Sequence, residues 1–463
     1  MNKLQWFAFA VLASVASVTG AQQAPPPPGP PRPFQLPTPV TISLPNGVQA
    51  TFVDFGVIPK VSVAVAVRTG NLNEGDKTWL ADLTGDLLKE GTKDRNSGQI
   101  ADAATLMGGQ LGISVTADET LLSLDVLSEY GADAVGLLAE VLTTPALPES
   151  ELARIRQDYL RNLSVQTTQP QAIAGAAMAD LLYPDHPYGK SFPTVEQLNS
   201  YSIADIRGYY DANFGARRTH VYVAGRFDRA AIEKAIRESL GGWREGAPPL
   251  QLAPTDARPR TVKLLDRPGA PQSTLRIGKR VIDPTQPNFM PLSVANTMLG
   301  GVLTSRITMN LREAKGWAYS PGSGIATQYH QATWLENADV KSAQTGPSVS
   351  EIFKEIDLLR SEAPTEPELT SIKNYRNGIF VMSTSTRGGL IGQLAFMNLQ
   401  GLPSNWLTTF VDRLYAVTPA QITQAARDHL DPTQMSVVIV GDLATVKPQI
   451  EAIAPLRDAI AKP

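Results

Sequence analysis

The chain has 463 residues, with 41 Lys and Arg against 44 Asp and Glu, four histidines and no cysteine. A net charge of −3 without a long basic run excludes an electrostatic nucleic-acid binder. The lack of cysteine excludes disulfides, thiol nucleophiles, Fe–S clusters and Cys-ligated zinc. Hydrophobic residues at 43% and charged residues at 18% exclude a largely disordered chain. The length predicts about two to four domains.

The N-terminus is typical of an export signal. Lys3 supplies the positive charge, an apolar run covers Trp6–Val18, and small residues end at Ala21. A membrane anchor is the alternative, but it would need roughly 20 apolar residues. We therefore predict a signal peptide over 1–21, cut near Ala21, then a Pro-rich spacer over 22–39. The mature chain is expected to be periplasmic or secreted, without a membrane span.

The rest of the chain contains an internal duplication. Ser202–Gly225 aligns without gaps onto Thr418–Gly441, and Glu149–Leu160 matches Glu366–Asn377. In the first pair, a hydroxyl N-cap opens a helix and a short loop leads into a β-branched strand. The sequence therefore predicts a first repeat over 40–240, a Pro- and Ala-rich linker over 241–260 and a second repeat over 261–463.

The first repeat shows which elements to expect. Residues 51–55 and 61–67 alternate as a half-buried antiparallel strand pair would. Residues 77–89 have helical periodicity, and 111–118 and 120–128 return to strand character. This order predicts an α+β fold, with helices covering one face of a mainly antiparallel sheet in each repeat.

Four phrases identify a family. They are WLADLTGDLLKEGT (Trp79–Thr92), MGGQLGISVTAD (Met107–Asp118), HPYG (His186–Gly189) and LGGVLTSRITMNLREAKGWAYSPGS (Leu299–Ser323). In this order, from about Val40 to the C-terminus, the chain resembles the insulinase/pitrilysin family of zinc peptidases, which includes mitochondrial processing peptidase. The resemblance also implies a two-repeat architecture.

The resemblance locates a zinc site that has lost its ligands. The family motif His-x-x-Glu-His falls on DLTGD, so Asp82 and Asp86 replace the histidines and Gly85 replaces the general base. Asn162 occupies the position of the distal ligand on a later helix. Catalytic zinc needs three protein ligands and prefers nitrogen or sulfur donors, so we expect no metal in this chain. Two alternatives are a harder cation on Asp82 and Asp86, which would want about six oxygens, and solvated acids near a helix N-terminus.

The four histidines offer no replacement for this site. His186, His220, His330 and His429 are isolated, without a second histidine three to five residues away. We expect His186 to pack in a loop and His220 to lie in a strand. A Ser-His-Asp triad assembled in space stays open, although no GxSxG motif supports one.

The second repeat keeps a different part of the family's site. LREAKGWAYS carries Arg312 and Tyr319 at the spacing that the family uses for its substrate-contacting pair. A guanidinium and a phenol are good donors to a developing oxyanion. The alternative is that Arg312 pairs with a nearby acid while Tyr319 packs in the core. Gly300 and Gly301, just upstream, are expected to permit a tight helix entry or a simple turn.

These features imply a function through the resemblance. We expect a non-catalytic, substrate-binding subunit of a heterodimeric periplasmic zinc metallopeptidase, which supplies Arg312 and Tyr319 to the partner's zinc site. The partner would be a homologous subunit with an intact His-x-x-Glu-His motif, and the substrate a peptide added to one of the partner's sheet edges. The alternative is a catalytically inert peptide-binding or structural scaffold protein, like the core subunits of respiratory cytochrome complexes. An active hydrolase with an unrecognised site has no motif in its support.

Overall fold

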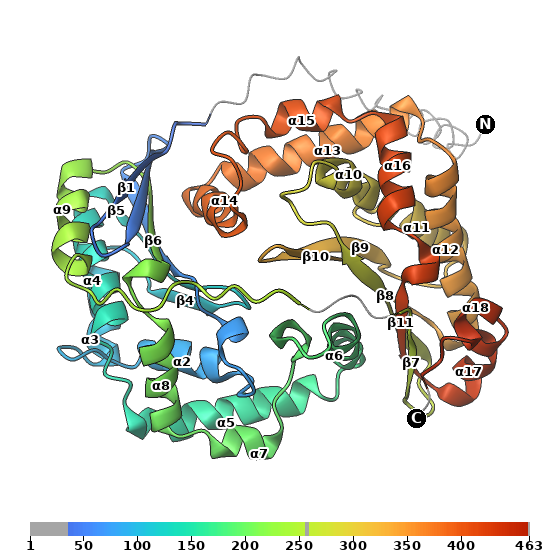
Figure 1. The fold of residues 1–463 in the computed structure, drawn as a ribbon, viewed down its shortest axis with the longest axis horizontal. Coiled ribbons are helices and arrows are strands. Elements are labelled where there is room, and N and C mark those ends of the chain that lie inside the picture. The colour runs from blue at the N-terminus through green and yellow to red at the C-terminus, as the bar shows by residue number, and fades with distance from the viewer. Residues whose placement is uncertain (1–35, 255–258, 462–463) are drawn as a thin grey trace, which may run out of the picture. The chain divides into compact units, whose positions relative to one another are not determined.

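The computed structural model describes residues 36–254 and 259–461. The predicted signal peptide, residues 22–35 of the spacer and residues 255–258 of the linker lie outside this part. The described chain contains two β-sheets with helices packed against them (Figure 1). None of its helices is both long and apolar enough to cross a bilayer. The repeat boundaries at 240 and 261 stay predictions.

The two sheets repeat one strand order. The first is ordered β1-β2-β6-β3-β5-β4 and the second β7-β11-β8-β10-β9. In each sheet one pair is parallel, β2 with β6 and β7 with β11, and the other pairs are antiparallel. Apart from the additional β1, order and direction agree, which confirms the predicted α+β fold. The strands are β1 (Val40–Ser43), β2 (Gln49–Asp54), β3 (Lys60–Val67), β4 (Gly112–Val115), β5 (Thr120–Leu127), β6 (Thr219–Gly225), β7 (Val262–Asp266), β8 (Gln272–Val281), β9 (Gly322–Gln328), β10 (Gln331–Lys341) and β11 (Ser436–Gly441).

The helices also show the duplication. Ser202 and Thr418 are the N-caps of α8 and α16, and each side-chain oxygen accepts a hydrogen bond from a backbone N–H three residues later. The helices are α2 (Leu80–Leu88), α3 (Ser97–Leu106), α4 (Gly131–Thr143), α5 (Glu149–Gln166), α6 (Pro170–Leu182), α7 (Val195–Ser200), α8 (Ile203–Asn213), α9 (Arg229–Leu240), α10 (Phe289–Leu299), α11 (Arg306–Thr308), α12 (Thr345–Ser361), α13 (Glu366–Thr384), α14 (Arg387–Gln400), α15 (Phe410–Ala416), α16 (Pro419–His429), α17 (Leu443–Glu451) and α18 (Ala454–Arg457).

The expected antiparallel pair at the start of the first repeat is wrong. β6 lies between β2 and β3, bonded to β2 in parallel and to β3 antiparallel. β3 is also not half-buried, because α14 contacts its second face and that of β6. A strand that is covered by apolar neighbours on both faces does not need a polar side. The alternating residues of β3 therefore did not indicate that both of its faces are buried.

Each sheet therefore contacts a helix that comes from the other half of the chain. On β11, Val437 and Ile439 belong to the core of the second sheet, whereas Val438 and Val440 pack against α6. Successive strand residues point to opposite faces, so the strand is buried on both sides. This exchange of α6 and α14 explains why β3 and β11 are buried along almost their whole length.

An ion pair joins α14 to the first sheet. Arg387 donates two hydrogen bonds to the carboxylate of Asp125 on β5, at 2.9 and 3.1 Å. Lys60 and Ser62 on β3 also donate to this carboxylate. Burial alone would raise the pKa of Asp125, but the hydrogen bonds from Arg387, Lys60 and Ser62 lower it to about 2. The charged form is therefore stabilised in the folded chain.

We expect Asp125→Asn to lower the free energy of unfolding at pH 7 by about 1 kcal/mol, a value reduced by solvent screening of this partly exposed carboxylate. The folded pKa lies below the unfolded value of about 3.9. The contribution is therefore present above that value and is lost as the pH falls from about 4 to 2. Urea unfolding at pH 7 and pH 3 measures this, with Asp94→Asn on an exposed loop as control. A difference in the free energy of unfolding between wild type and Asp125→Asn that is equal at both pH values would show that the hydrogen bonds do not lower the pKa of Asp125.

Candidate functional site

The N-terminus of α2 is held by a buried acid that the sequence did not single out. Glu74 accepts hydrogen bonds from the backbone N–H groups of Trp79 and Ala81, at 3.0 and 3.1 Å. Burial raises the pKa of Glu74 to about 7, although these bonds oppose the rise. Trp79 has a left-handed backbone with φ 68°, and its ring packs against Tyr159 and Phe192. Together these contacts fix the start of the helix that carries Asp82, Gly85 and Asp86.

The motif positions meet in one pocket. A hollow of about 460 Å³ is lined by Asp82 and Asp86 from α2 and by Asp158, Tyr159 and Asn162 from α5, with Trp79 beside them. The structure thus brings together the two acids and the asparagine that the resemblance assigns to the former ligand positions. Their descent from zinc ligands stays a prediction. Tyr159 could have been found, because it lies one helical turn from Asn162 on the same face.

Both acids already have partners. Asn71 donates to Asp82 at 2.6 Å, and Tyr159 donates to Asp86 at 2.8 Å. Lys89 forms an ion pair with Asp86 at 2.5 Å. Burial raises the pKa of Asp82 and that of Tyr159, and the charge of Asp86 raises the latter further. The two carboxylates are half-buried and hydrogen-bonded, not the solvated acids of the simpler alternative.

This donor set does not fit zinc. It offers carboxylates and an amide without a nitrogen or sulfur ligand, and Gly85 has no side chain to act as a base. In residues 36–254 and 259–461 no cluster of three or more His, Cys, Asp or Glu is arranged to hold a metal ion. These residues therefore do not support a metal-dependent step in this chain.

The structure also leaves no space for a side chain at Gly85. A Cβ built at this position would lie 2.6 Å from a methyl group of Val115 on β4, closer than real contacts allow. Val115 is β-branched and stiff in its strand, so it has little freedom to move aside. The space that a general base would need is filled by the neighbouring strand.

We expect Gly85→Ala to be destabilising by about 1 to 3 kcal/mol relative to the same change at Gly136, because it overpacks this contact. Gly136 lies in α4, where an added Cβ would meet nothing within 4 Å, and Ala there should stabilise by roughly 0.5 to 1 kcal/mol. Urea denaturation of both variants measures the difference. Equal urea midpoints of the two variants would show that Val115 moves aside and that α2 can accept a side chain at position 85.

The Arg312–Tyr319 pair lies on the second half of the chain. Arg312 belongs to the π-helical segment η5 (Met309–Ala314), and Tyr319 lies in the loop before β9. The guanidinium carbon is 5.2 Å from the centre of the phenol ring. Arg312 also contacts Glu313 at 3.2 Å, as one alternative expected, but Tyr319 is 78% exposed and so does not pack in the core. The two side chains are adjacent and open to a ligand.

The segment before this pair is anchored from two sides. Arg306 donates two hydrogen bonds to Glu368 of α13, at 2.8 and 2.9 Å. Asn310 donates to Glu351 and Glu355 of α12, at 2.9 and 2.6 Å. Bidentate and charge-assisted bonds of this kind fix geometry as well as contributing energy. They hold η5, and with it Arg312, on the surface.

Gly300 and Gly301 do not open a helix but form a turn, which is the alternative that the sequence left open. They end α10, and the next helix begins only at Arg306. A Cβ at Gly300 would lie 2.4 Å from the backbone nitrogen of Ser323, and one at Gly301 would lie 2.6 Å from Thr297. Gly300 is needed because β9 approaches the end of α10 this closely, and Gly301 because it lies against Thr297 in the last turn of α10.

Next to Gly300 lies a buried acid, Glu336, which the sequence analysis did not single out. Glu336 on β10 is 1% exposed, and none of the described residues gives either carboxyl oxygen a hydrogen bond of good geometry. Burial raises its pKa well above the ordinary value, against smaller opposing effects of the Gly322 N–H and Arg276. The signal was present: Glu336 alternates with Trp334 and Ala338 on the buried face of one strand.

Two histidines take structural positions. His186 accepts from the Tyr188 N–H at 3.2 Å and lies 3.3 Å from the Leu252 carbonyl, and burial lowers its pKa. His220 bonds Thr51 at 2.8 Å and stacks on Tyr222, and burial lowers its pKa to about 4. Both are neutral at pH 7, in the loop and the strand expected for them.

Two protein-family descriptions match the sequence. Residues 57–192 match the family description "Insulinase (Peptidase family M16)", and residues 200–375 match "Peptidase M16 inactive domain". The chain belongs to the insulinase family. The second match covers both Arg312 and Tyr319. The family predicted from the four sequence phrases is therefore confirmed.

Relatives within the insulinase family are distant. The chain is 26% identical over 290 residues to an uncharacterized zinc protease of Mycobacterium leprae, covering 61% of this chain and 65% of that protein. It is 22% identical over 387 residues to an uncharacterized zinc protease of Bacillus subtilis, covering 82% and 93%. A non-peptidase homolog of Helicobacter pylori is 20% identical over 391 residues, covering 83% and 90%.

Solved structures share the insulinase fold. The peptidase M16 inactive domain from Pseudomonas fluorescens superposes with a TM-score of 0.81 at 23% identity, covering 87% of this chain and 98% of that one. The periplasmic protease PqqL from Escherichia coli gives 0.77 at 15% identity, covering 94% of this chain and 50% of that one. These likenesses show that the fold is shared, and the match of residues 200–375 to the inactive-domain description supports a non-catalytic member of the insulinase family.

Proposed function

We propose that this chain is the non-catalytic, substrate-binding subunit of a heterodimeric zinc metallopeptidase in the periplasm. Its partner would be a homologous subunit with an intact His-x-x-Glu-His motif, and that subunit would hold the zinc and activate water. The chain itself would contribute Arg312 and Tyr319 to the peptide held between the two subunits.

The asymmetry of the two half-sites carries this proposal. On the α2 side, the positions that the resemblance assigns to zinc ligands hold Asp82, Asp86 and Asn162, and the two acids are bound to their own neighbours. On the other side, Arg312 and Tyr319 are adjacent and accessible. A scaffold protein has no need of an exposed Arg–Tyr pair on a segment held by three acids, whereas a substrate-binding subunit does.

The chemistry of the pair suits peptide hydrolysis. The Arg312 guanidinium can bind a peptide carbonyl, and its charge would stabilise the oxyanion that forms when that carbonyl is attacked. The Tyr319 hydroxyl is a second, neutral donor on the same oxygen. Arg312 is preorganised by the anchored η5 segment, and its guanidinium lies against the Tyr319 ring, so little rearrangement is needed on binding.

The location in the periplasm has two supports. The N-terminal sequence is typical of an export signal. A structural neighbour, the PqqL protease of Escherichia coli, is itself described as periplasmic.

The test is to purify the tagged mature chain from native envelope extract and to identify what comes with it in stoichiometric amount. We expect an insulinase-family homologue with the intact motif at one to one, and peptidase activity that a chelator removes and zinc restores. An extract from an untagged strain is the control. Recovery of the chain alone or as a homodimer, without zinc or activity, would overturn the proposal in favour of an inert peptide-binding or scaffold protein.

A further inference from the structure

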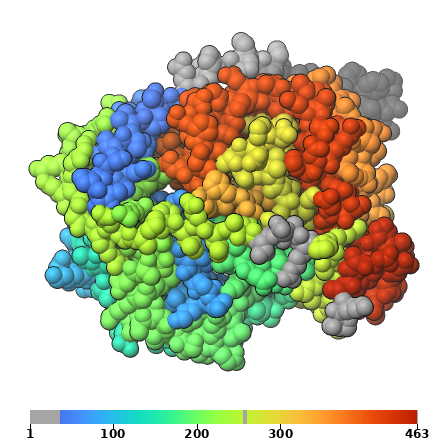
Figure 2. Space-filling model, viewed as in Figure 1, coloured from blue at the N-terminus to red at the C-terminus, as the bar shows by residue number. Residues whose placement is uncertain are grey.

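A second pocket lies entirely on the later half of the chain. It has a volume of about 770 Å³ and is enclosed by the loop before α10, the loop between α14 and α15, α15 itself and the start of α16. Figure 2 shows the yellow surface of the α10 region bordered by the orange-red surface of the later helices. Neither the Arg312–Tyr319 pair nor the pocket of Asp82 and Asp86 shares a residue with it.

The pocket is built on rigid backbone. Gly401 ends α14 with φ 65°, and the loop after it is closed by hydrogen bonds from Trp406 N–H to the Pro403 carbonyl and from Thr409 to the Asn405 carbonyl. Prolines form much of the wall, at positions 284, 287, 291 and 403. A preformed cavity of this size is in the range that takes a small ligand without large ordering costs.

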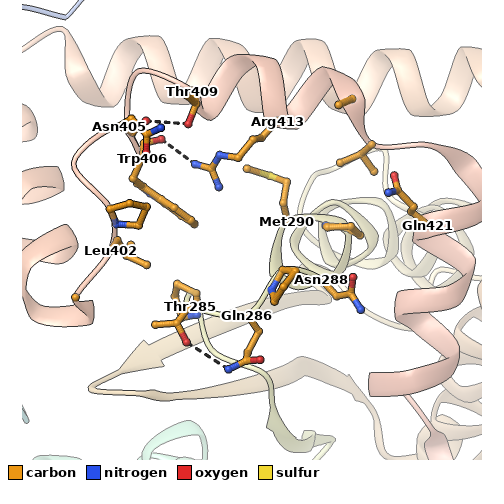
Figure 3. A pocket seen from close by; sticks show the side chains of 17 residues that line it. Thr285, Gln286, Asn288, Met290, Leu402, Asn405, Trp406, Thr409, Arg413 and Gln421 are labelled. Atoms are coloured by element: carbon orange, nitrogen blue, oxygen red, sulfur yellow. Dashed lines mark hydrogen bonds between the residues drawn. The ribbon is translucent and has the colours of Figure 1, made fainter.

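One charge faces this cavity. Arg413 of α15 stacks on Trp406, with its guanidinium carbon 3.7 Å from the ring centre, and donates to the Trp406 carbonyl at 2.8 Å (Figure 3). Its Nε is buried and has no hydrogen-bond partner in the described chain. Over residues 36–254 and 259–461, no carboxylate lies within ion-pair distance of Arg413, and the lining contains no other charged side chain. Burial lowers the pKa of Arg413, which agrees with a charge that lacks a counter-ion.

The rest of the lining is apolar and amide. Figure 3 shows Met290, Leu402 and Trp406 around the cavity, with Gln286 at its far side from Arg413. A lone guanidinium is matched in charge by a monoanion, and its planar donors match a carboxylate. A phosphate dianion would need a second cation that the lining lacks. The apolar walls suit a hydrophobic body next to that carboxylate.

We propose that this pocket binds a monocarboxylate attached to an apolar side group. Two sources share this chemistry: a small organic acid, and the C-terminal residue of a peptide. The Arg413 guanidinium would take the carboxylate, Trp406 and Met290 would pack on the apolar group, and the Gln286 amide would reach a polar group on the same ligand. The site is independent of the proposed peptidase role, because it needs neither the partner nor Arg312.

The experiment is isothermal titration calorimetry on the full mature chain. The probes are N-acetyl-phenylalanine and its amide, the tripeptide Ala-Ala-Phe and its C-terminal amide, and inorganic phosphate. We expect each acid to bind at least about tenfold more tightly than its amide, because only the acid forms charge-assisted hydrogen bonds. Binding of N-acetyl-phenylalanine alone indicates small organic acids, and binding of both acids indicates a peptide C-terminus. Both outcomes support the pocket.

Variants locate the binding. Arg413→Met should weaken both acids by tenfold or more and remove the difference between acid and amide, whereas Arg457→Met, on an exposed helix end, should change nothing. Should Arg413→Met fail to fold, Gln286→Ala on the exposed loop and the wild-type acid–amide comparison still decide. Equal affinity for acid and amide, tighter binding of phosphate than of the acids, or no binding at millimolar concentration would each overturn the proposal.

Discussion

In the pair formed with the proposed zinc-bearing subunit, replacing Arg312 by alanine is expected to lower kcat on the order of 10²-fold, with little change in KM. The guanidinium is partly exposed and held by the anchored η5 segment, so its loss removes a donor to the developing oxyanion without disturbing the core. A change in kcat at constant KM is typical of an interaction made mainly in the transition state. Peptide turnover at saturating and at limiting substrate separates the two constants.

Tyr319→Phe should act in the same direction, because it removes only the hydroxyl donor and leaves the ring on which Arg312 stacks. Arg237→Ala on α9, which breaks an exposed pair with Glu233, is the matched control and should retain full activity. Co-purification with the partner must be unchanged in all three variants. Full turnover by both site variants in an intact pair would remove the role proposed for Arg312 and Tyr319.

A second large effect concerns stability. We expect Glu336→Gln to raise the free energy of unfolding at pH 7, by about 1.4 kcal/mol for each unit by which burial raises the pKa of Glu336 above its unfolded value. Because burial raises the folded pKa of Glu336, the folded chain keeps a proton that the unfolded chain releases above pH of about 4.3. The wild type therefore loses stability as the pH rises through that value. Glutamine does not titrate and escapes this loss.

Urea unfolding between pH 4 and pH 8 measures the effect. The advantage of Glu336→Gln should be near zero at pH 4 and grow toward neutral pH. Glu451→Gln, an exposed acid on α17, should show no such trend. An advantage that is absent at pH 7, or that is constant across the range, would show that Glu336 is not held protonated by burial.

Much of the fold could be predicted from residue patterns. The gapless match between Ser202–Gly225 and Thr418–Gly441 indicated two copies of one unit, and both N-caps and both following strands are where the match placed them. Such features depend on residues close together in the chain. Helix caps and strand periodicity are local, so sequence alone can specify them.

The pairing of strands could not be predicted in the same way. β2 and β3 are neighbours in sequence and both alternate, yet β6, more than a hundred residues later, lies between them. The second face of β3, like that of β6, contacts α14 from the other half of the chain, which is why β3 lacks a polar side. Periodicity indicates that a strand has a buried face, but not what buries it.

The sequence by itself determined the family and the duplication, and it predicted which half-site lost its ligands, because these rest on residue identity at fixed spacing. Only the tertiary structure decided that Asp82 and Asp86 are bound by Asn71 and Tyr159, that Val115 fills the space at Gly85, and that Arg413 faces a pocket without a counter-ion. Each of these depends on atoms from segments far apart in the chain. Burial, hydrogen bonding and steric exclusion depend on contacts between such distant segments, so they are defined only in the folded chain.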